Sequence, residues 1–341
     1  MFSVYATMDQ RLPLSQVGAH AQRAEALGYD GLAVPEAVHD GLLAAAIALQ
    51  ATTRLRVATS VLVAFPRSPM TVAHATWDLQ EASGGRFALG LGSQVKGNIV
   101  GRYSTPWSAP VPRMREYVQS LRAIFDAWQN GTALRFEGVH YRFTRMQPFF
   151  NPGPLACPAM PIFLGGIGRT MTALAGEVAD GLMTHPTNTS PRYLREVVRP
   201  QLAKGAARSG RDAATVKVMV SPLIATGSSL AAVQSARENA RQLLAFLYST
   251  PVYRPSLELF GWSERGEQLH QLSRAGRWSE MASLVSDEML DVLVPSAPYA
   301  EIAAELTAWY GGLTDWIVLP MPADPAHDRE VAAVVGRLRG A

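Results

Sequence analysis

Three glycines stand beside an arginine and a threonine in the segment LGGIGRT, residues 164–170. The segment follows a short apolar run and precedes an amphipathic stretch that predicts a helix. A glycine-rich turn into a helix N-terminus directs backbone N–H groups at an anion, and the helix dipole adds to the attraction. Glycines at such a junction can also serve packing alone. The candidate phosphate ligands are Gly165, Gly166, Gly168, Arg169 and Thr170.

The segment PEAVHD, residues 35–40, combines two carboxylates with a histidine. Such a group can exchange protons near neutral pH, so Glu36 and His39 are the candidate catalytic residues. In the alternative interpretation, Asp40 caps the following helix and His39 is a solvated loop residue. A second histidine, His185, follows another strand-like run and is a candidate cofactor ligand, although a lone histidine there is more often structural than catalytic.

The segment GLGSQVKGN, residues 90–98, places amide, hydroxyl and ammonium groups after two glycines. Glycine lets a backbone approach a ligand closely, although G-x-G alone also describes a tight turn. The candidate ligands here are Gly92, Ser93, Gln94, Lys96 and Asn98. The sequence contains no HExxH, G-x-S-x-G or P-loop motif, and we expect no bound metal.

Short β-branched runs alternate with longer amphipathic segments, which favours βαβ units and a parallel sheet. The segment TMDQRLP after the first strand contains no glycine, so the dinucleotide-binding fingerprint of a Rossmann fold is missing. We therefore predict an α/β fold, a (β/α)8 TIM barrel over residues 1–341, with a helical insertion or lid at 228–312 before the last strand. The expected strands are Phe2–Ala6, Asp30–Pro35, Leu55–Val63, Arg86–Gly92, Pro161–Leu164, Asp180–Thr184, Val216–Ala225 and Asp315–Pro320. In such barrels the site lies at the C-terminal ends of the strands, where all of the candidates above fall.

Hydrophobic residues make up 48% of the chain and charged residues 17%, which suits a globular enzyme with a substantial core. The net charge is +3, but the basic residues are scattered, so we expect no nucleic-acid partner. No apolar stretch reaches the roughly 18 residues of a membrane span, and the N-terminus lacks a signal-peptide pattern. Cys157 is the single cysteine, which excludes an intrachain disulfide. A cytoplasmic location is expected.

Four segments, in this order, resemble the luciferase-like monooxygenase superfamily: AEALGYDGLAVPE, ATTRLRVATSVLVAFPRSPM, ASGGRFALGLG and AGEVADGLMTH. The segment GSQVKGNIVGRYSTPW, followed by RMREYV, looks more specifically like the coenzyme F420-dependent oxidoreductase branch. The resemblance covers nearly the whole chain. It implies a non-prolyl cis peptide at Ser60–Val61 behind the cofactor ring, a phosphate cradle at residues 165–170 and a ring-lining segment at 92–94.

The resemblance implies hydride transfer between the deazaflavin C5 and a small organic substrate, in a homodimer. Lys96, Arg102 and Arg169 are candidates for a basic rim around the anionic cofactor tail. Two departures concern proton transfer, because Ala37 and Gln94 replace a histidine and a glutamate that relatives often carry. The alternatives are a flavin mononucleotide (FMN) monooxygenase that uses reduced flavin and oxygen, and a cofactor-binding barrel without catalysis.

Overall fold

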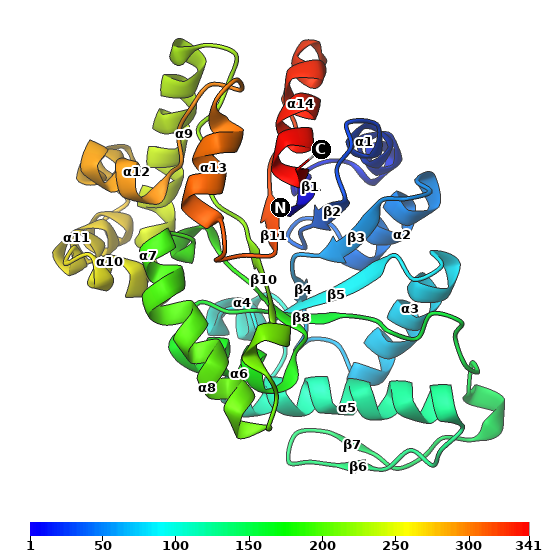
Figure 1. Cartoon of the computed structure of the whole chain (residues 1–341). Coiled ribbons are helices and arrows are strands. Elements are labelled where there is room, and N and C mark those ends of the chain that lie inside the picture. The colour runs from blue at the N-terminus through cyan, green and yellow to red at the C-terminus, as the bar shows by residue number, and fades with distance from the viewer. Residues whose placement is uncertain (341) are drawn as a thin grey trace.

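A computed structural model describes residues 1–340, and within them nine strand segments form one closed parallel sheet. The segments are β1 (Ser3–Thr7), β2 (Gly31–Val34), β3 (Arg56–Thr59), β4 (Leu62–Val63), β5 (Phe87–Gly92), β8 (Ile162–Gly165), β9 (Gly181–Met183), β10 (Lys217–Val220) and β11 (Trp316–Val318). β1 pairs with β2 on one side and with β11 on the other, and the ring closes where β3 pairs with β5. β3 and β4 are one interrupted strand, so the predicted eight-stranded barrel is confirmed (Figure 1).

The third expected strand, Leu55–Val63, is broken in the middle. The peptide bond between Ser60 and Val61 is cis, in agreement with the resemblance. Just before the break, the Thr59 hydroxyl donates to the Gly90 carbonyl and accepts from the Gly90 N–H, both at 2.9 Å. The side chain of Thr59 thereby ties β3 to β5 directly below the interruption.

An outer ring of helices covers the barrel, and most of these helices begin where the sequence provides a cap or a proline. Asp40, for example, accepts hydrogen bonds from the N–H groups of Leu42 and Leu43 at the start of α2, as the capping interpretation predicts. Residues 191–208 form three consecutive helical segments: α7, a π-helical turn and α8. The ring consists of α1 (Leu14–Ala26), α2 (Gly41–Ala51), α3 (Pro69–Ala82), α5 (Pro110–Asn130), α6 (Arg169–Val178), α7 (Pro191–Tyr193), α8 (Arg199–Arg208), α13 (Ile302–Tyr310) and α14 (Asp328–Arg339).

Aromatic rings close the N-terminal end of the barrel interior. The Tyr5 ring lies over Gly31 and the Phe163 ring over Gly181, where any Cβ atom would be 2.2–2.4 Å from the ring. The Trp316 indole stacks on the Tyr5 ring and contacts the Phe163 ring at a tilt, with ring centroids 4.7 and 4.8 Å away. Glycine at the two strand starts therefore makes room for the rings that fill the barrel floor.

The crossover from β5 to β8 carries α4 (Lys96–Gly101) and a small hairpin of β6 (Phe136–Glu137) and β7 (Arg142–Phe143). The two strands of the hairpin pair antiparallel, and the hairpin lies alongside α5 in Figure 1. The Glu116 carboxylate of α5 accepts hydrogen bonds from the N–H groups of Val139 and His140 in the turn of the hairpin. These bonds attach the hairpin to the helix.

The segment expected as a helical insertion, 228–312, is helical, but its parts pack differently. Its helices α9 (Leu230–Tyr248), α10 (Pro255–Leu259), α11 (Ser263–Arg274) and α12 (Asp287–Leu293) surround a hydrophobic cluster of their own, separate from the barrel core. α13 instead buries Ile302 and Leu306 in the main core and packs against α14. The separate helical unit therefore ends before α13, which serves as the crossover helix to β11.

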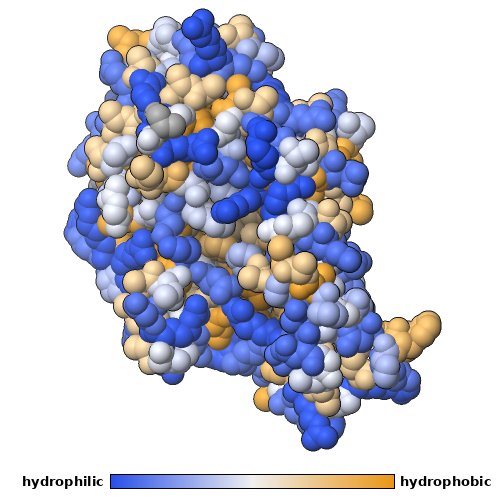
Figure 2. Space-filling model, turned by 45° about the vertical axis from the view of Figure 1, so that its right-hand side comes forward, coloured by the Kyte–Doolittle hydropathy of each residue, from blue (hydrophilic) through white to orange (hydrophobic). Residues whose placement is uncertain are grey.

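The surface in Figure 2 is mostly hydrophilic, with hydrophobic residues in scattered groups. None of the helices in residues 1–340 combines the length and the apolar composition that crossing a membrane requires.

Candidate active site

A cavity of about 870 Å³ opens at the C-terminal ends of the barrel strands. It brings together eleven of the residues that the sequence analysis singled out: Glu36, Ser60, Val61, Gly92, Ser93, Gln94, Gly165, Gly166, Gly168, Thr170 and His185. Five others, His39, Lys96, Asn98, Arg102 and Arg169, do not line it in the part of the chain that the structure describes. The position of the cavity agrees with the rule for barrel enzymes.

The Val61 side chain projects between two strands that carry glycine at its level. A Cβ atom on Gly92 would meet Val61 Cγ2 at 2.5 Å, and one on Gly165 would meet Val61 Cγ1 at 3.2 Å. Gly92 is thus required by the packing of Val61 and not only by a ligand, whereas Gly165 has a tight contact with the same side chain. Together Val61, Gly92 and Gly165 form a smooth, largely apolar surface that fits the face of a flat ring.

The turn before α6 presents backbone N–H groups to the same cavity. Among the described residues, no acceptor pairs with the N–H groups from Gly168 to Met171, as expected for the first turn of a helix. Asn188 and Tyr193 donate hydrogen bonds to the carbonyls of Gly166 and Ile167, at 3.0 and 3.1 Å. These bonds fix the turn through its carbonyls and leave its N–H groups directed at a ligand, which fits a phosphate.

The residues around this turn have different roles. Gly166 is needed for packing, because a Cβ atom there would lie 2.8 Å from Leu182. Nothing lies within 4 Å of the corresponding position on Gly168, so that glycine leaves open space at the helix start. Thr170 and Arg169 are exposed, and only Thr170 lines the cavity.

The Glu36 carboxylate lines the cavity but is already fully engaged. It accepts two hydrogen bonds from Arg67, at 2.6 and 3.0 Å, and a third from the Val63 N–H at 2.6 Å. Arg67 also binds Asp40 at 2.7 Å. Burial alone would raise the pKa of Asp40, but hydrogen bonds from the Leu43 N–H and from Arg67 hold this pKa below its ordinary value.

This arrangement gives Glu36 a structural task, since its negative charge is balanced and its oxygens are occupied. Arg67 was not among the candidate residues predicted from the sequence, although it lies only four residues after Val63 in the segment FPRSPM. His39 does not reach the cavity, so the two predicted catalytic residues do not form a pair there. Their roles in proton transfer remain predictions that the geometry does not favour.

His185 is the histidine that the structure places in the cavity wall. Its ring stacks on Tyr253, with centroids 4.4 Å apart, and Nδ1 lies 2.9 Å from the Thr187 hydroxyl. Burial lowers the pKa of His185 to about 4, so the ring is neutral at pH 7. The Thr187 N–H also lies within hydrogen-bond distance of Nδ1, at 3.4 Å, and this contact favours the tautomer with the ring proton on Nε2.

Gln94 has a left-handed backbone conformation, with φ of 57°. Its Oε1 accepts from the Val95 N–H at 2.9 Å and from Asn98 Nδ2 at 3.2 Å. Asn98 is therefore a support for Gln94 and not a residue of the cavity wall. Lys96 is exposed at the start of α4.

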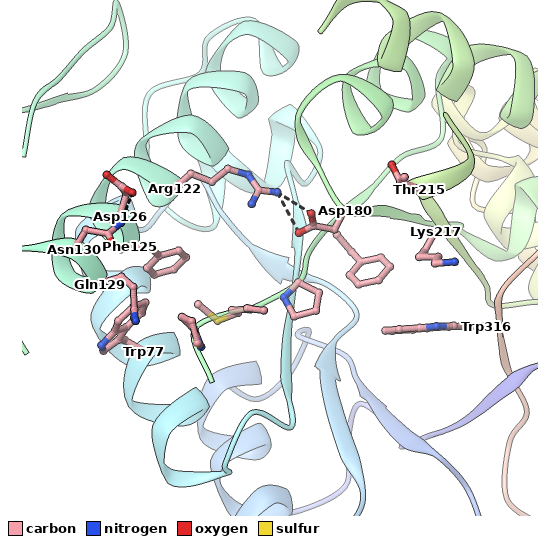
Figure 3. A pocket seen from close by; sticks show the side chains of 15 residues that line it. Trp77, Arg122, Phe125, Asp126, Gln129, Asn130, Asp180, Thr215, Lys217 and Trp316 are labelled. Atoms are coloured by element: carbon pink, nitrogen blue, oxygen red, sulfur yellow. Dashed lines mark hydrogen bonds and ion pairs between the residues drawn. The ribbon is translucent and has the colours of Figure 1, made fainter. Parts of the chain in front are cut away.

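A second hollow, of about 640 Å³, lies at the opposite, N-terminal end of the barrel (Figure 3). The Trp316 indole lines it, and its polar side chains already have partners within the chain. Arg122 pairs with Asp180 at 3.1 Å, and Gln129 bonds to the backbone of Leu155. With its polar groups satisfied, this hollow offers no directed contact to a ligand.

Metal ligands are not gathered at either hollow. Within residues 1–340, no three His, Cys, Asp or Glu side chains lie close enough to hold a metal ion.

Comparison with known proteins agrees with this geometry. The luciferase-like monooxygenase family matches residues 2–315, and the chain belongs to that family. An uncharacterized protein of Mycobacterium tuberculosis is 43% identical over 314 residues, 91% of this chain and 92% of that protein. The chain is also 27% identical over 292 residues to the 5,10-methylenetetrahydromethanopterin reductase of Archaeoglobus fulgidus, covering 83% and 82% of the two chains.

Among solved structures, the coenzyme F420 dependent tetrahydromethanopterin reductase of Methanopyrus kandleri superimposes with a TM-score of 0.79. The superposition covers 99% of both chains at 16% sequence identity, so it shows that the fold is the same. The family and the barrel expected from the sequence are therefore confirmed, and the family is one of oxidoreductases and monooxygenases.

Proposed function

We propose that the protein is a coenzyme F420-dependent oxidoreductase. The observation that carries the proposal is the joint presence of the Val61 surface and the free N–H groups before α6 in one cavity. The Val61 surface fits a flat ring, and the N–H groups before α6 fit the phosphate on the side chain that such a ring carries. A putative coenzyme F420-dependent oxidoreductase of Mycobacterium tuberculosis, 27% identical to this chain over 310 residues, supports the choice of deazaflavin over FMN.

When bound, a deazaflavin donates or accepts a hydride at C5, and the protein supplies orientation and electrostatics. The residues around α6 would hold the phosphate, and the surface of Val61, Gly92 and Gly165 would support the ring. A substrate that gains or loses a hydride also exchanges a proton or needs a hydrogen-bond donor at the reacting group. The neutral His185, with its proton on Nε2, fits the donor role better than the engaged Glu36.

Spectroscopic titration with F420 and with FMN, each followed by its own absorbance, tests the proposal. We expect saturable binding of F420. Thr170→Asp should weaken F420 binding at least tenfold, because a carboxylate at the helix start repels the phosphate. Thr170→Asn introduces a side chain of nearly the same shape as aspartate but without the charge, and it should change F420 binding only slightly. Tight binding of FMN without binding of F420 would contradict the proposal. F420 binding without turnover of any substrate would favour the non-catalytic alternative.

A further inference from the structure

We infer that the substrate of this site is an uncharged, largely apolar molecule that carries a carbonyl or hydroxyl group at its reacting carbon. The inference rests on the proposed function and names the substrate class that the same cavity selects. It follows from the wall of the cavity formed by residues 221–253, which contains the start of the helical unit.

This wall lies across the barrel mouth from the Val61 surface. In the closed ring, the strands follow one another as β1, β2, β3 with β4, β5, β8, β9, β10 and β11. The strand interrupted at Val61 is third in this order and β10 is seventh, so they face each other. A substrate held over a ring on Val61 is therefore covered by the segment that follows β10.

The cavity side of this segment is almost entirely apolar. α9 contributes Ala236, Asn239, Ala240 and Leu243, whose spacing of three and four residues places them on one face. Ile224 after β10 and Val252 after α9 extend the same surface. Leu243 and Val252 remain 42% and 49% exposed, so the apolar surface continues to the rim of the cavity.

The charged residues of α9 lie on its other side and are already paired. Arg237 binds Asp291 at 2.7 Å, and Arg241 binds Asp287 of α12 at 2.5 Å. These ion pairs connect α9 to α12 and keep both guanidinium groups out of the cavity lining. The arginines consequently stabilise the helical unit and do not serve as ligands of a substrate.

No lysine or arginine lines the cavity within the residues that the structure describes. The one charged side chain in its lining, Glu36, is neutralised by Arg67. A carboxylate or phosphate on the substrate would lose its hydration against the apolar wall without gaining a cation, which is unfavourable. A neutral carbonyl or hydroxyl oxygen needs only one donor, and the uncharged His185 in the cavity lining is the candidate for this role.

Matched pairs of neutral and anionic ketones test the inference without requiring turnover. The probes are methyl 4-oxocyclohexanecarboxylate and methyl 7-oxooctanoate, each compared with its free carboxylate at pH 7.5. Calorimetric titration uses protein first loaded with oxidised F420, which cannot reduce a ketone. We expect each ester to bind at least tenfold more tightly than its carboxylate.

A charge placed in the wall should change this preference. Leu243→Arg should tighten carboxylate binding about tenfold, because the new guanidinium supplies the missing cation. Leu230→Arg is the matched control: Leu230 is 76% exposed on the same helix, about 20 Å away along the axis, and does not line the cavity. This variant should leave both affinities unchanged.

Equal or tighter binding of the carboxylates by the unaltered protein would overturn the inference, as would failure of both esters to bind. A protein that does not take up F420 before the probes are added contradicts the proposed function instead, so the two failures can be told apart.

Discussion

His185 illustrates how a single side chain acquires its properties from a distant part of the chain. The residue follows β9, but the ring that covers it belongs to Tyr253 in the helical unit. Burial lowers its pKa to about 4, so it remains a neutral donor under ordinary conditions. The sequence analysis included His185 in the site, but the contact with Tyr253 spans 68 residues and left no local signal.

Removing the Tyr253 ring should return His185 toward ordinary behaviour. In Tyr253→Ala we expect the pKa of His185 to rise by about one unit or more, because water gains access to the imidazole. Tyr253→Phe keeps the stacked ring and should leave the pKa of His185 near that of the unaltered protein. Histidine resonances followed by NMR across a pH titration measure both.

The lowered pKa of His185 also makes the stability of the fold depend on pH. The unfolded chain protonates His185 near its ordinary pKa of 6.5, whereas the folded protein does so only near 4. The free energy of unfolding therefore falls as the pH drops from 6.5 toward 4. Urea unfolding at several pH values should show a smaller fall in Tyr253→Ala than in Tyr253→Phe. Identical pH profiles would contradict the role given to the ring.

At the scale of strands and helices, sequence patterns identified most elements but not their interruptions. Alternating apolar runs predicted all eight barrel strands, because strands buried on both faces are rich in β-branched and apolar residues. The break in the third strand has no signal in hydrophobic periodicity, and only the family resemblance indicated it. Likewise, the pattern of α13 could not show whether it packs on the barrel or on the helical unit, since both surfaces are apolar.

The contact between β5 and the cis bulge leads to a prediction for glycine replacements. Gly92→Ala places a methyl group 2.5 Å from Val61 Cγ2, so we expect a loss of about 2 kcal/mol in the free energy of unfolding and weaker cofactor binding. Gly97→Ala, in α4, meets nothing within 4 Å and should be neutral or slightly stabilising. Chemical denaturation measures the free energy of unfolding of each variant, and titration measures its affinity for the cofactor. Equal losses of stability in Gly92→Ala and Gly97→Ala would refute this account of Gly92.

At the scale of the whole molecule, the fold was predictable because each level of the sequence agreed on it: the βα alternation, the missing Rossmann fingerprint and the positions of the candidate ligands. The ion pairing of Glu36 was not predictable, because its partner Arg67 lies 31 residues away along the chain. Spacing along the chain cannot show such a partner.

We propose that the protein is a homodimer, as the family resemblance implied. Size-exclusion chromatography with light scattering should give twice the mass of one chain, independent of F420. A mass of one chain at micromolar concentration would contradict the proposal.

The rings of Tyr5, Trp316 and Phe163 close the N-terminal end of the barrel interior, so the cavity opens only at the C-terminal ends of the strands. The Val61 surface and the α9 wall face each other across this opening. A substrate bound against Leu243 would therefore cover a cofactor bound against Val61. We expect the cofactor to bind before the substrate and to leave after the product.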